Sequence, residues 1–311
     1  MPVARPNDSI AEIHMLLCKR DLYVGLLAIR SLLRFHPPAW AVSLSDDGTL
    51  TAGDRRRVDQ LIPGVRWISW PDAAAEVDRR LTMGDLTTDA PDRKSKTENR
   101  KSSTPRFPHL LALYHSRYAP VCKLLHATLL ARCPRVIVLD PDTAFFQPPE
   151  RLIAFATGQE PGPLYLHDHQ DEAVTVPVEV QATFAELASA ITPPGWSWRL
   201  GHRLFNSGLL AFAPAQMRLD LAEQYLAWRE KLPEVLKMGK AAIWFGDWTP
   251  EQTCYHIMFA LQDPAGPPAQ PLGDDYHLGG QEGHVFNHFL RHYLVQRPVL
   301  RRLRRLAQEL S

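Results

Sequence analysis

The sequence predicts an α/β protein with a mostly parallel central sheet and helices on both faces. Short apolar runs alternate with segments whose apolar residues recur at helical spacing, which is typical of consecutive β-α units. The run Arg135–Leu139 is apolar and β-branched after its first residue, as expected for a strand buried on both faces. With 311 residues, of which 45% are hydrophobic and 22% charged, the chain has enough apolar material for a large core.

The expected elements follow one another along the first half of the chain. A strand at Glu12–Cys18 precedes a helix at Tyr23–Phe35, in which Leu26, Ile29 and Leu33 share one face. Strands are expected at Trp40–Ser45 and Val65–Trp70, and helices at Gly53–Leu61, Ala73–Leu81, Leu110–Tyr118 and Val121–Ala131. The segment 84–105 has almost only small, polar or charged residues, so we expect a mobile insertion or lid there.

Charge and cysteine usage exclude several classes of protein. The 35 basic and 34 acidic residues give a net charge of +1, so bulk charge does not hold this chain to nucleic acid. No apolar run approaches the ~20 residues that cross a bilayer, and residues 1–9 lack the apolar stretch of a signal peptide. The four cysteines form no C-x-x-C pair, which argues against a zinc ribbon or a disulfide framework. We expect a cytoplasmic protein.

Two carboxylates follow the buried strand directly, in the sequence Asp140-Pro141-Asp142. In open α/β sheets the ligand crevice lies beyond the carboxyl ends of the strands. Two carboxylates separated by one residue at that edge can bind one divalent cation and leave positions open for phosphate oxygens. The alternative is a simple turn, because Asp and Pro both favour turns.

Leu139–Thr143 resembles the Asp-x-Asp motif of GT-A-fold glycosyltransferases, and most of the chain resembles family 8, the glycogenin and bacterial galactosyltransferase group. The resemblance implies a GT-A fold, which is a Rossmann-like nucleotide-diphospho-sugar transferase domain, over residues 10–290. It also implies a UDP-sugar donor. Donor-binding positions matching the family are Cys18, Lys19, Tyr23, Asp46, Lys123, Asp140, Pro141, Asp142 and Arg291.

Within this resemblance, Tyr23 and the backbone of Cys18 and Lys19 match the positions that hold the uracil ring. Asp46 lies in a segment similar to the end of the family's second strand. Lys123 takes the place of a family arginine, which keeps the charge. Arg291 is the substitute for a phosphate-binding lysine that has no clear counterpart here.

The resemblance also nominates residues in the last third of the chain. Asn206 matches the asparagine that contacts the donor sugar, Glu251 and Gln252 match a pair beside the reacting carbon, and His288 matches the histidine that completes the metal site. The expected metal ligands are therefore Asp140, Asp142 and His288.

Each of these residues also has a purely structural interpretation. Asn206 fits a strand-entry turn. Gln252 fits a capping box that starts at Thr249, with Pro250 at the first helical position. His288 lies on an apolar segment, where a histidine is more often a core residue than a ligand. Asp168, in the cluster His167-Asp-His169, is a further candidate for contact with sugar hydroxyls.

The predicted function is a metal-dependent, retaining glycosyltransferase that moves a hexose from a UDP-sugar to a saccharide, lipid-linked or small-molecule acceptor. Mixed carboxylate and imidazole ligation favours Mn²⁺, or else Mg²⁺, over Ca²⁺. Two alternatives remain. A sugar-1-phosphate nucleotidylyltransferase usually opens with a Gly-rich phosphate loop, which Cys18–Tyr23 lacks. A non-catalytic nucleotide-sugar-binding protein would bind the same donor without turnover.

The C-terminal residues 291–311 are expected to form a basic amphipathic helix. Leu300, Leu303, Leu306 and Leu310 fall near helical spacing beside four arginines, Arg301, Arg302, Arg304 and Arg305. Such a helix either lies on the anionic inner face of a membrane, close to a lipid-linked acceptor, or packs its apolar stripe on the domain or on a second subunit of a homodimer.

Overall fold

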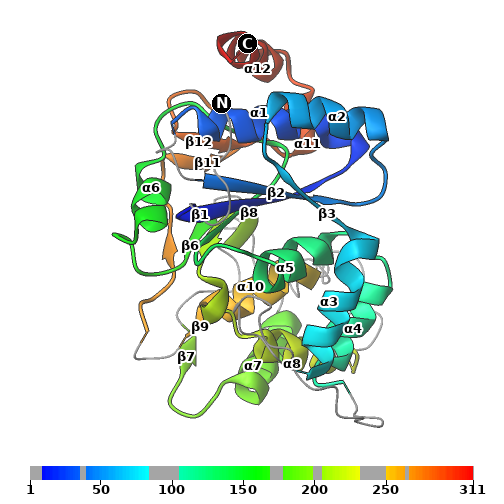
Figure 1. Ribbon diagram of the computed structural model, residues 1–311. Helices are drawn as coiled ribbons and strands as arrows, with labels where there is room; N and C mark the ends of the chain where they lie inside the picture. The colour runs from blue at the N-terminus through cyan, green and yellow to red at the C-terminus, as the bar shows by residue number, and fades with distance from the viewer. Residues whose placement is uncertain are drawn as a thin grey trace.

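A computed structural model of the protein describes residues 9–35, 40–83, 105–168, 178–198, 205–231, 250–262 and 266–310. At its centre lies a seven-stranded sheet with the strand order β10-β6-β8-β4-β1-β2-β3 (Figure 1). The strands are β1 (Ala11–Leu17), β2 (Trp40–Asp46), β3 (Arg66–Ser69), β4 (Val136–Leu139), β6 (Leu164–His167), β8 (Phe205–Phe212) and β10 (Gln270–Pro271). All neighbours pair in parallel except β8, which is antiparallel to both β4 and β6. The predicted mostly parallel sheet is therefore confirmed.

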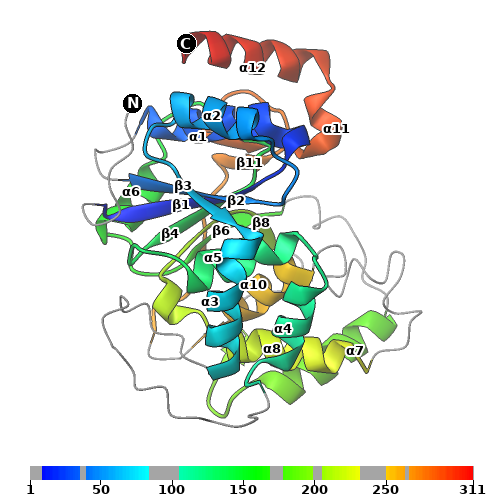
Figure 2. The ribbon, with the colours of Figure 1, turned by 45° about the vertical axis from the view of Figure 1, so that its right-hand side comes forward.

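Helices cover both faces of this sheet, as the sequence predicts (Figures 1 and 2). One face carries α1 (Leu22–Leu33), which follows the short 3-10 turn Lys19–Asp21, and α2 (Ala52–Leu61). The other side carries α3 (Trp70–Met83), α4 (Pro108–His115), α5 (Pro120–Leu129), α7 (Val178–Ile191), α8 (Leu219–Arg229) and α10 (Pro250–Ala260), and α6 (Glu150–Thr157) flanks the sheet. Each face has its own apolar core, so the sheet is buried on both sides.

The helix predicted at Ala73–Leu81 begins earlier, at Trp70, directly after β3. Ser69 explains this start, because its Oγ accepts a hydrogen bond from the N–H of Asp72 at 3.4 Å, as a helix-capping hydroxyl does. The strand predicted at Val65–Trp70 is accordingly shortened to Arg66–Ser69. The predicted insertion, 84–105, lies outside the described residues except for Pro105.

A second, three-stranded sheet in the order β11-β12-β5 adjoins the first. It consists of β5 (Thr143–Phe145), β11 (Tyr276–Leu278) and β12 (Phe286–His288). Only three residues, 140–142, separate β4 from β5, so the chain passes from the large sheet into the small one through the Asp-Pro-Asp motif. A separate two-stranded sheet pairs β7 (Ser197–Trp198) antiparallel with β9 (Leu261–Gln262). Pro214–Gln216 forms a 3-10 turn after β8.

The C-terminal segment, expected as one helix over 291–311, forms two helices, α11 (Leu290–Leu294) and α12 (Arg297–Glu309). Pro298 explains the new start, because proline lacks an N–H and is best accommodated in the first turn of a helix. Val299, Leu303 and Leu306 are buried against the domain, and Leu310 packs beside them, so this face of the helix has a protein partner in this chain. Leu300, which was expected in the stripe, is 37% exposed, because at 3.6 residues per turn it lies to the side of the packed face. Among the described helices, none is both long and apolar enough to span a bilayer.

Candidate active site

Asp140 and Asp142 lie on the link between the two sheets, and backbone hydrogen bonds hold this link on both sides. The N–H of Asp140 donates to the carbonyl of Gly208 in β8 at 2.9 Å, and the N–H of Phe289 donates to the carbonyl of Asp142 at 2.8 Å. The hydroxyl of Thr143 donates to the carbonyl of Asp140 at 2.8 Å. Both carboxylates are thus presented at the carboxyl end of β4 by a fixed backbone.

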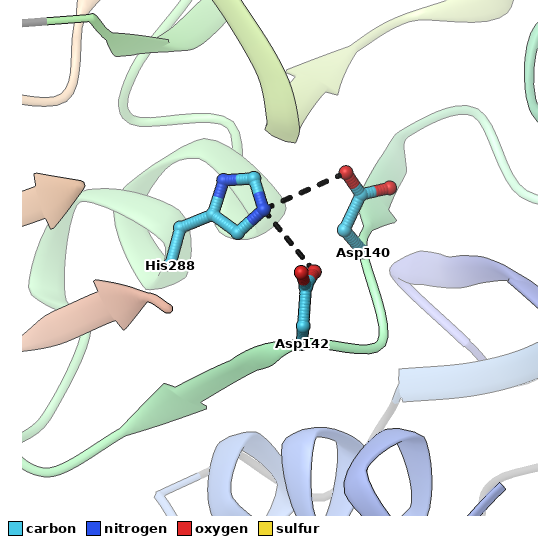
Figure 3. A group of neighbouring side chains, drawn as sticks. All are labelled: Asp140, Asp142 and His288. Atoms are coloured by element: carbon cyan, nitrogen blue, oxygen red, sulfur yellow. Dashed lines mark hydrogen bonds and ion pairs between the residues drawn. The ribbon is translucent and has the colours of Figure 1, made fainter. Parts of the chain in front are cut away.

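His288 reaches the same place from β12, which pairs antiparallel with β5 and sets His288 opposite Thr143. Its Nε2 lies 3.1 Å from Oδ1 of Asp142 and 3.9 Å from Oδ2 of Asp140 (Figure 3). One ligand atom from each of the three residues lies within 4.8 Å of the others. The structure therefore brings together the three residues that the sequence nominates as metal ligands.

Without a cation, Asp142 and His288 stabilise each other's charged forms. Burial raises the pKa of Asp142, but its hydrogen bond to His288 and the charge of that ring outweigh burial, so the pKa of Asp142 lies below its usual value. Burial lowers the pKa of His288, but Asp142 and Asp140 outweigh it and raise that pKa above 6.5. A proton on Nε2 of His288 occupies the position that a metal ion would take.

Asn206 and Gly208, both in β8, position the His288 ring at its Nδ1 edge, whereas the carboxylates lie at its Nε2 edge. The Oδ1 of Asn206 accepts a hydrogen bond from the N–H of Gly208 at 2.8 Å and lies 3.1 Å from Nδ1 of His288. Because a backbone N–H can only donate, the side-chain oxygen of Asn206 must face the ring, and Nδ1 must carry a proton. The neutral ring then presents the lone pair of Nε2 to the two carboxylates.

These observations fit a small divalent cation. Two carboxylates and one imidazole are a donor set suited to a divalent cation, and the other imidazole nitrogen is held by a hydrogen bond, as is usual for a metal-binding histidine. Asp140 divides its oxygens between two roles: Oδ1 lies 2.6 Å from Nζ of Lys123, while Oδ2 faces Nε2 of His288.

Lys123 links the two carboxylates to a second group of polar residues. Its buried ammonium lies 3.7 Å from Oε1 of Glu251 and donates to Oγ of Ser207 at 3.0 Å. Burial lowers the pKa of Lys123, but Asp140 and Glu251 outweigh it and hold that pKa above its ordinary value. The ammonium therefore stays charged, and it partly neutralises the negative charge of Asp140.

Ser207 also holds Gln252, the neighbour of Glu251 at the start of α10. Its Oγ lies 3.1 Å from Oε1 of Gln252 and 3.3 Å from Oε1 of Glu251, and the Nε2 of Gln252 donates to the carbonyl of Phe205 at 3.4 Å. Both α10 side chains thus adjoin β8. The capping alternative for Gln252 involves Thr249, which lies outside the described residues.

Side chains alternate between the two sides of β8, which explains why its residues contact both His288 and the Lys123–Glu251 pair. Asn206 and Gly208 face His288 on one side of the strand, and Ser207 faces Lys123 of α5 and the start of α10 on the other. The sequence analysis names Asn206 but gives no role to Ser207 or Gly208. Their signal is the Asn-Ser-Gly triplet inside an apolar run, since the period of two on a strand predicts alternating contacts.

Gly208 is sterically required at its position. A Cβ built there would lie 2.3 Å from Nδ1 of His288 and 2.9 Å from Oδ1 of Asn206, both closer than real Cβ contacts allow. Pro141 also contacts a glycine, because a Cβ at Gly25 of α1 would lie 3.2 Å from the Pro141 Cβ. A glycine therefore lies close to the Asp140-Pro141-Asp142 site on each side, Gly208 of β8 and Gly25 of α1.

Four of the residues predicted to bind the donor, Cys18, Lys19, Tyr23 and Asp46, lie at the carboxyl ends of β1 and β2, which are adjacent strands. Asp46 is buried, and its carboxylate accepts from Arg55 and from the N–H of Gly48. Tyr23 is 63% exposed and accepts a hydrogen bond from Arg57. Among the described residues, no hydrogen bond or ion pair joins Tyr23 or Asp46 to the metal-ligand candidates.

Cys18 and Lys19 complete this end of the sheet. The thiol of Cys18 lies 3.1 Å from Oδ2 of Asp21. The N–H of Lys19 donates to Oγ1 of Thr49 at 2.8 Å, and its ammonium lies 3.5 Å from Asp54. These contacts fix the turn between β1 and α1 in front of the β2 end.

Arg291 and Asp168 are the two remaining candidates from the sequence. Arg291 belongs to α11, but its side chain lies outside the described part of the chain. Asp168 does lie near the site, with its Oδ2 3.5 Å from Nδ2 of Asn206, whereas His169 is outside the described residues.

No protein-family profile matches the sequence, and a search of curated proteins finds no match. Solved structures of similar shape include the galactosyltransferase LgtC in complex with donor and acceptor sugar analogs (13% identity, 96% of each chain covered, TM-score 0.45). Mouse xyloside xylosyltransferase 1 aligns over 94% of this chain and 99% of its own, at 13% identity and a TM-score of 0.47. Core-mannan synthase A from Aspergillus fumigatus, in its Mn/GDP form, aligns over 86% and 77%, at 10% identity and a TM-score of 0.46.

These three are glycosyltransferases, the class that the sequence motifs resemble. The likeness is remote in identity and in TM-score, so the case for function rests on the residues of the site itself.

Proposed function

We propose that this chain is a metal-dependent glycosyltransferase that transfers a hexose from a UDP-sugar to an acceptor hydroxyl, with retention of anomeric configuration. The observation that carries the proposal is the convergence of Asp140, Asp142 and His288 at the carboxyl edge of the central sheet, within 4.8 Å of one another. The Asp-x-Asp, Asn-Ser-Gly and Glu-Gln motifs supply the donor class through their resemblance to family 8.

A divalent cation bound there would offset the negative charge that develops on the diphosphate leaving group. The chain's own residues prepare the site for it. Asn206 holds the proton of the neutral His288 ring at Nδ1, which leaves the lone pair of Nε2 available to the cation. Lys123 holds Oδ1 of Asp140 and leaves Oδ2 directed toward His288.

Glu251 and Gln252 are proposed to lie beside the sugar. Glu251 is only 2% exposed, and its Oε1 lies 3.7 Å from Nζ of Lys123. A carboxylate in this position would stabilise positive charge on the sugar ring. In the retaining scheme a diphosphate oxygen accepts the proton of the acceptor hydroxyl, so none of these residues needs to act as a base.

The test is release of the nucleoside diphosphate from a panel of UDP- and GDP-sugars, with Mn²⁺, with Mg²⁺ and with a chelator, in the presence of simple sugar acceptors. Metal-supported release of UDP and an anomeric configuration kept in the product, as measured by NMR, would support the proposal. Release from GDP-sugars alone would make it wrong about the donor.

The two alternatives give different products in the same assay. With pyrophosphate added to this assay, a nucleotidylyltransferase would convert the UDP-sugar and pyrophosphate into UTP and sugar-1-phosphate. A binding protein would retain a UDP-sugar without releasing UDP under any metal condition. Either result would contradict the transferase proposal.

A further inference from the structure

Helix α12 presents two opposite faces, and only one of them has a partner in the chain. Val299, Leu303 and Leu306 are buried against a small core that includes Ala144 and Phe289. At 3.6 residues per turn, the opposite side carries four exposed arginines, Arg297, Arg301, Arg304 and Arg305. In Figures 1 and 2, α12 is the outermost element on its side of the molecule, beyond α1 and α2.

This arginine face, defined by those four residues, is not neutralised by its surroundings. None of the four forms an ion pair with any described residue. The acidic residue at the end of the helix, Glu309, is paired with Arg34 at 3.0 Å. Since the whole chain has a net charge of only +1, the four arginines are a local excess of positive charge on α12 and not a property of a basic chain.

The arginine face is also fixed rigidly to the domain. Arg30 of α1 donates to the carbonyl of Leu310, one of the terminal carbonyls that a helix leaves free. Arg302, on the flank of α12, donates to the carbonyl of Gln281 and its guanidinium lies 3.5 Å from the centroid of the Phe146 ring. Arg302 thus serves attachment, while the other four arginines face solvent.

Two exposed apolar side chains accompany the arginines. Val295 is 76% exposed just before α12, and Leu300 is 37% exposed on the edge of the arginine face. Exposed apolar residues beside unpaired arginines suit a surface that is anionic outside and apolar beneath, which is a membrane with anionic lipids. A nucleic acid would match the charge but would offer Val295 and Leu300 no apolar partner.

We propose that the arginine face of α12 docks the protein on anionic phospholipid membranes while Val299, Leu303 and Leu306 stay packed on the domain. The helix would lie on the headgroups and attract them electrostatically, with Val295 and Leu300 as shallow contacts. The proposal does not depend on transferase activity, because binding to lipid is measured without any donor.

The experiment is sedimentation of the full-length protein with vesicles of phosphatidylcholine alone and with vesicles of phosphatidylcholine and phosphatidylglycerol in equal parts. We expect binding to the mixed vesicles only, and weaker binding at high salt. The triple variant R301Q/R304Q/R305Q should lose at least about tenfold in affinity for the mixed vesicles, since basic residues near an anionic surface each contribute measurably. The matched control R56Q/R117Q/R132Q removes one exposed arginine of α2 and two exposed loop arginines, and it should bind like the unmodified protein.

A second variant separates diffuse charge from specific recognition. R301K/R304K/R305K keeps the charge and should keep the binding, because a lipid surface does not require the planar guanidinium. Equal binding to neutral and mixed vesicles, or normal binding by the glutamine variant, would overturn the proposal. So would loss of binding in the lysine variant, or displacement from vesicles by an equal charge of RNA. Thermal melting of each variant shows whether the packed face of α12 is intact.

Discussion

The Nδ1 atom of His288 lies 3.1 Å from Oδ1 of Asn206, and this contact decides which ring nitrogen is available to a metal. Because the same oxygen accepts the N–H of Gly208 at 2.8 Å, the asparagine amide has one orientation. The ring proton is therefore held at Nδ1, and Nε2 faces Asp142. Residues from β8, β12 and the β4–β5 link thus act as one unit, and the first three predictions test that unit.

Asp142→Asn should weaken Mn²⁺ binding and lower turnover of the donor by roughly a hundredfold or more, since stabilisation of transition-state charge typically contributes a few kcal/mol. His288→Ala should behave in the same way. The measurement is turnover of UDP-sugar against Mn²⁺ concentration, with thermal melting as the control for folding.

His284→Ala and His292→Ala are the matched controls for these two variants, and their effects should be mild. The ring of His284 stacks on His277, with centroids 4.6 Å apart, and makes no contact with the two carboxylates. Full activity of Asp142→Asn at limiting Mn²⁺ would contradict the assignment of Asp140-Pro-Asp142 as a metal site.

Asn206→Ala should reduce Mn²⁺ affinity by about tenfold to a hundredfold, because a metal-bound histidine depends on the partner of its other nitrogen. Asn206→Asp keeps an oxygen toward Nδ1 and should retain more of the affinity than the alanine variant. Calorimetric titration with Mn²⁺, without donor, measures both. Equal affinities in Asn206→Ala and the unmodified protein would show that the contact has no influence on the ring.

Gly208→Ala should displace the His288 ring, because the new Cβ would start 2.3 Å from Nδ1. We expect weaker Mn²⁺ binding together with a loss of about 1–3 kcal/mol in the free energy of unfolding, the usual effect of overpacking. Gly53→Ala in α2 is the control. Its Cβ meets Thr51 Oγ1 only at 3.7 Å, and alanine favours a helix, so stability should be unchanged or slightly higher. Unaltered metal binding in Gly208→Ala would count against the close packing.

His126 should contribute to the pH dependence of stability. It is buried in α5, with its Nδ1 2.8 Å from Oγ of Ser45. Burial, with smaller contributions from His14 and Arg66, lowers its pKa from 6.5 to about 3. The unfolded chain binds a proton here below pH 6.5, but the folded chain does so only near pH 3. Stability that is present above pH 6.5 is therefore lost as the pH falls toward 3.

Between about pH 7 and about pH 5 this residue should account for about 2 kcal/mol of lost stability, at about 1.4 kcal/mol per pH unit below 6.5. Urea unfolding at both pH values measures it. His126→Gln should be less sensitive to acid than the unmodified protein, while His115→Gln, at an exposed histidine, should not differ. Identical acid sensitivity in all three would show that His126 is not responsible.

The sequence predicts the fold class and the carboxylate pair because both are local. Apolar runs define the strands, and Asp140 and Asp142 follow a strand directly, so the sheet itself puts them at its carboxyl edge. The reversed direction of β8 is not predictable in this way, since a strand buried on both faces reads the same in either direction. The break between α11 and α12 has a signal in Pro298, but the continuous leucine spacing obscures it.

The rest of the candidate site depends on contacts between distant segments. His288 is nominated only by resemblance, since no local pattern brings a residue of β12 to the end of β4. Lys123 is recognised as a charge, but the sequence does not indicate that it pairs with both Asp140 and Glu251. The Asn-Ser-Gly triplet indicates that Ser207 faces away from Asn206, but its partners Lys123 and Glu251 become apparent only when α5 and α10 pack on that side of β8.

Asp142 and His288 are 146 positions apart in the chain. During synthesis, both carboxylates are complete long before the imidazole is made, so the site cannot exist until β12 has paired with β5. Any cleavage that separates β12 from the rest would leave the carboxylates in place and remove the third ligand. A cation bound by all three would close this long loop and favour the fully assembled chain, so metal should protect the C-terminal third against proteases.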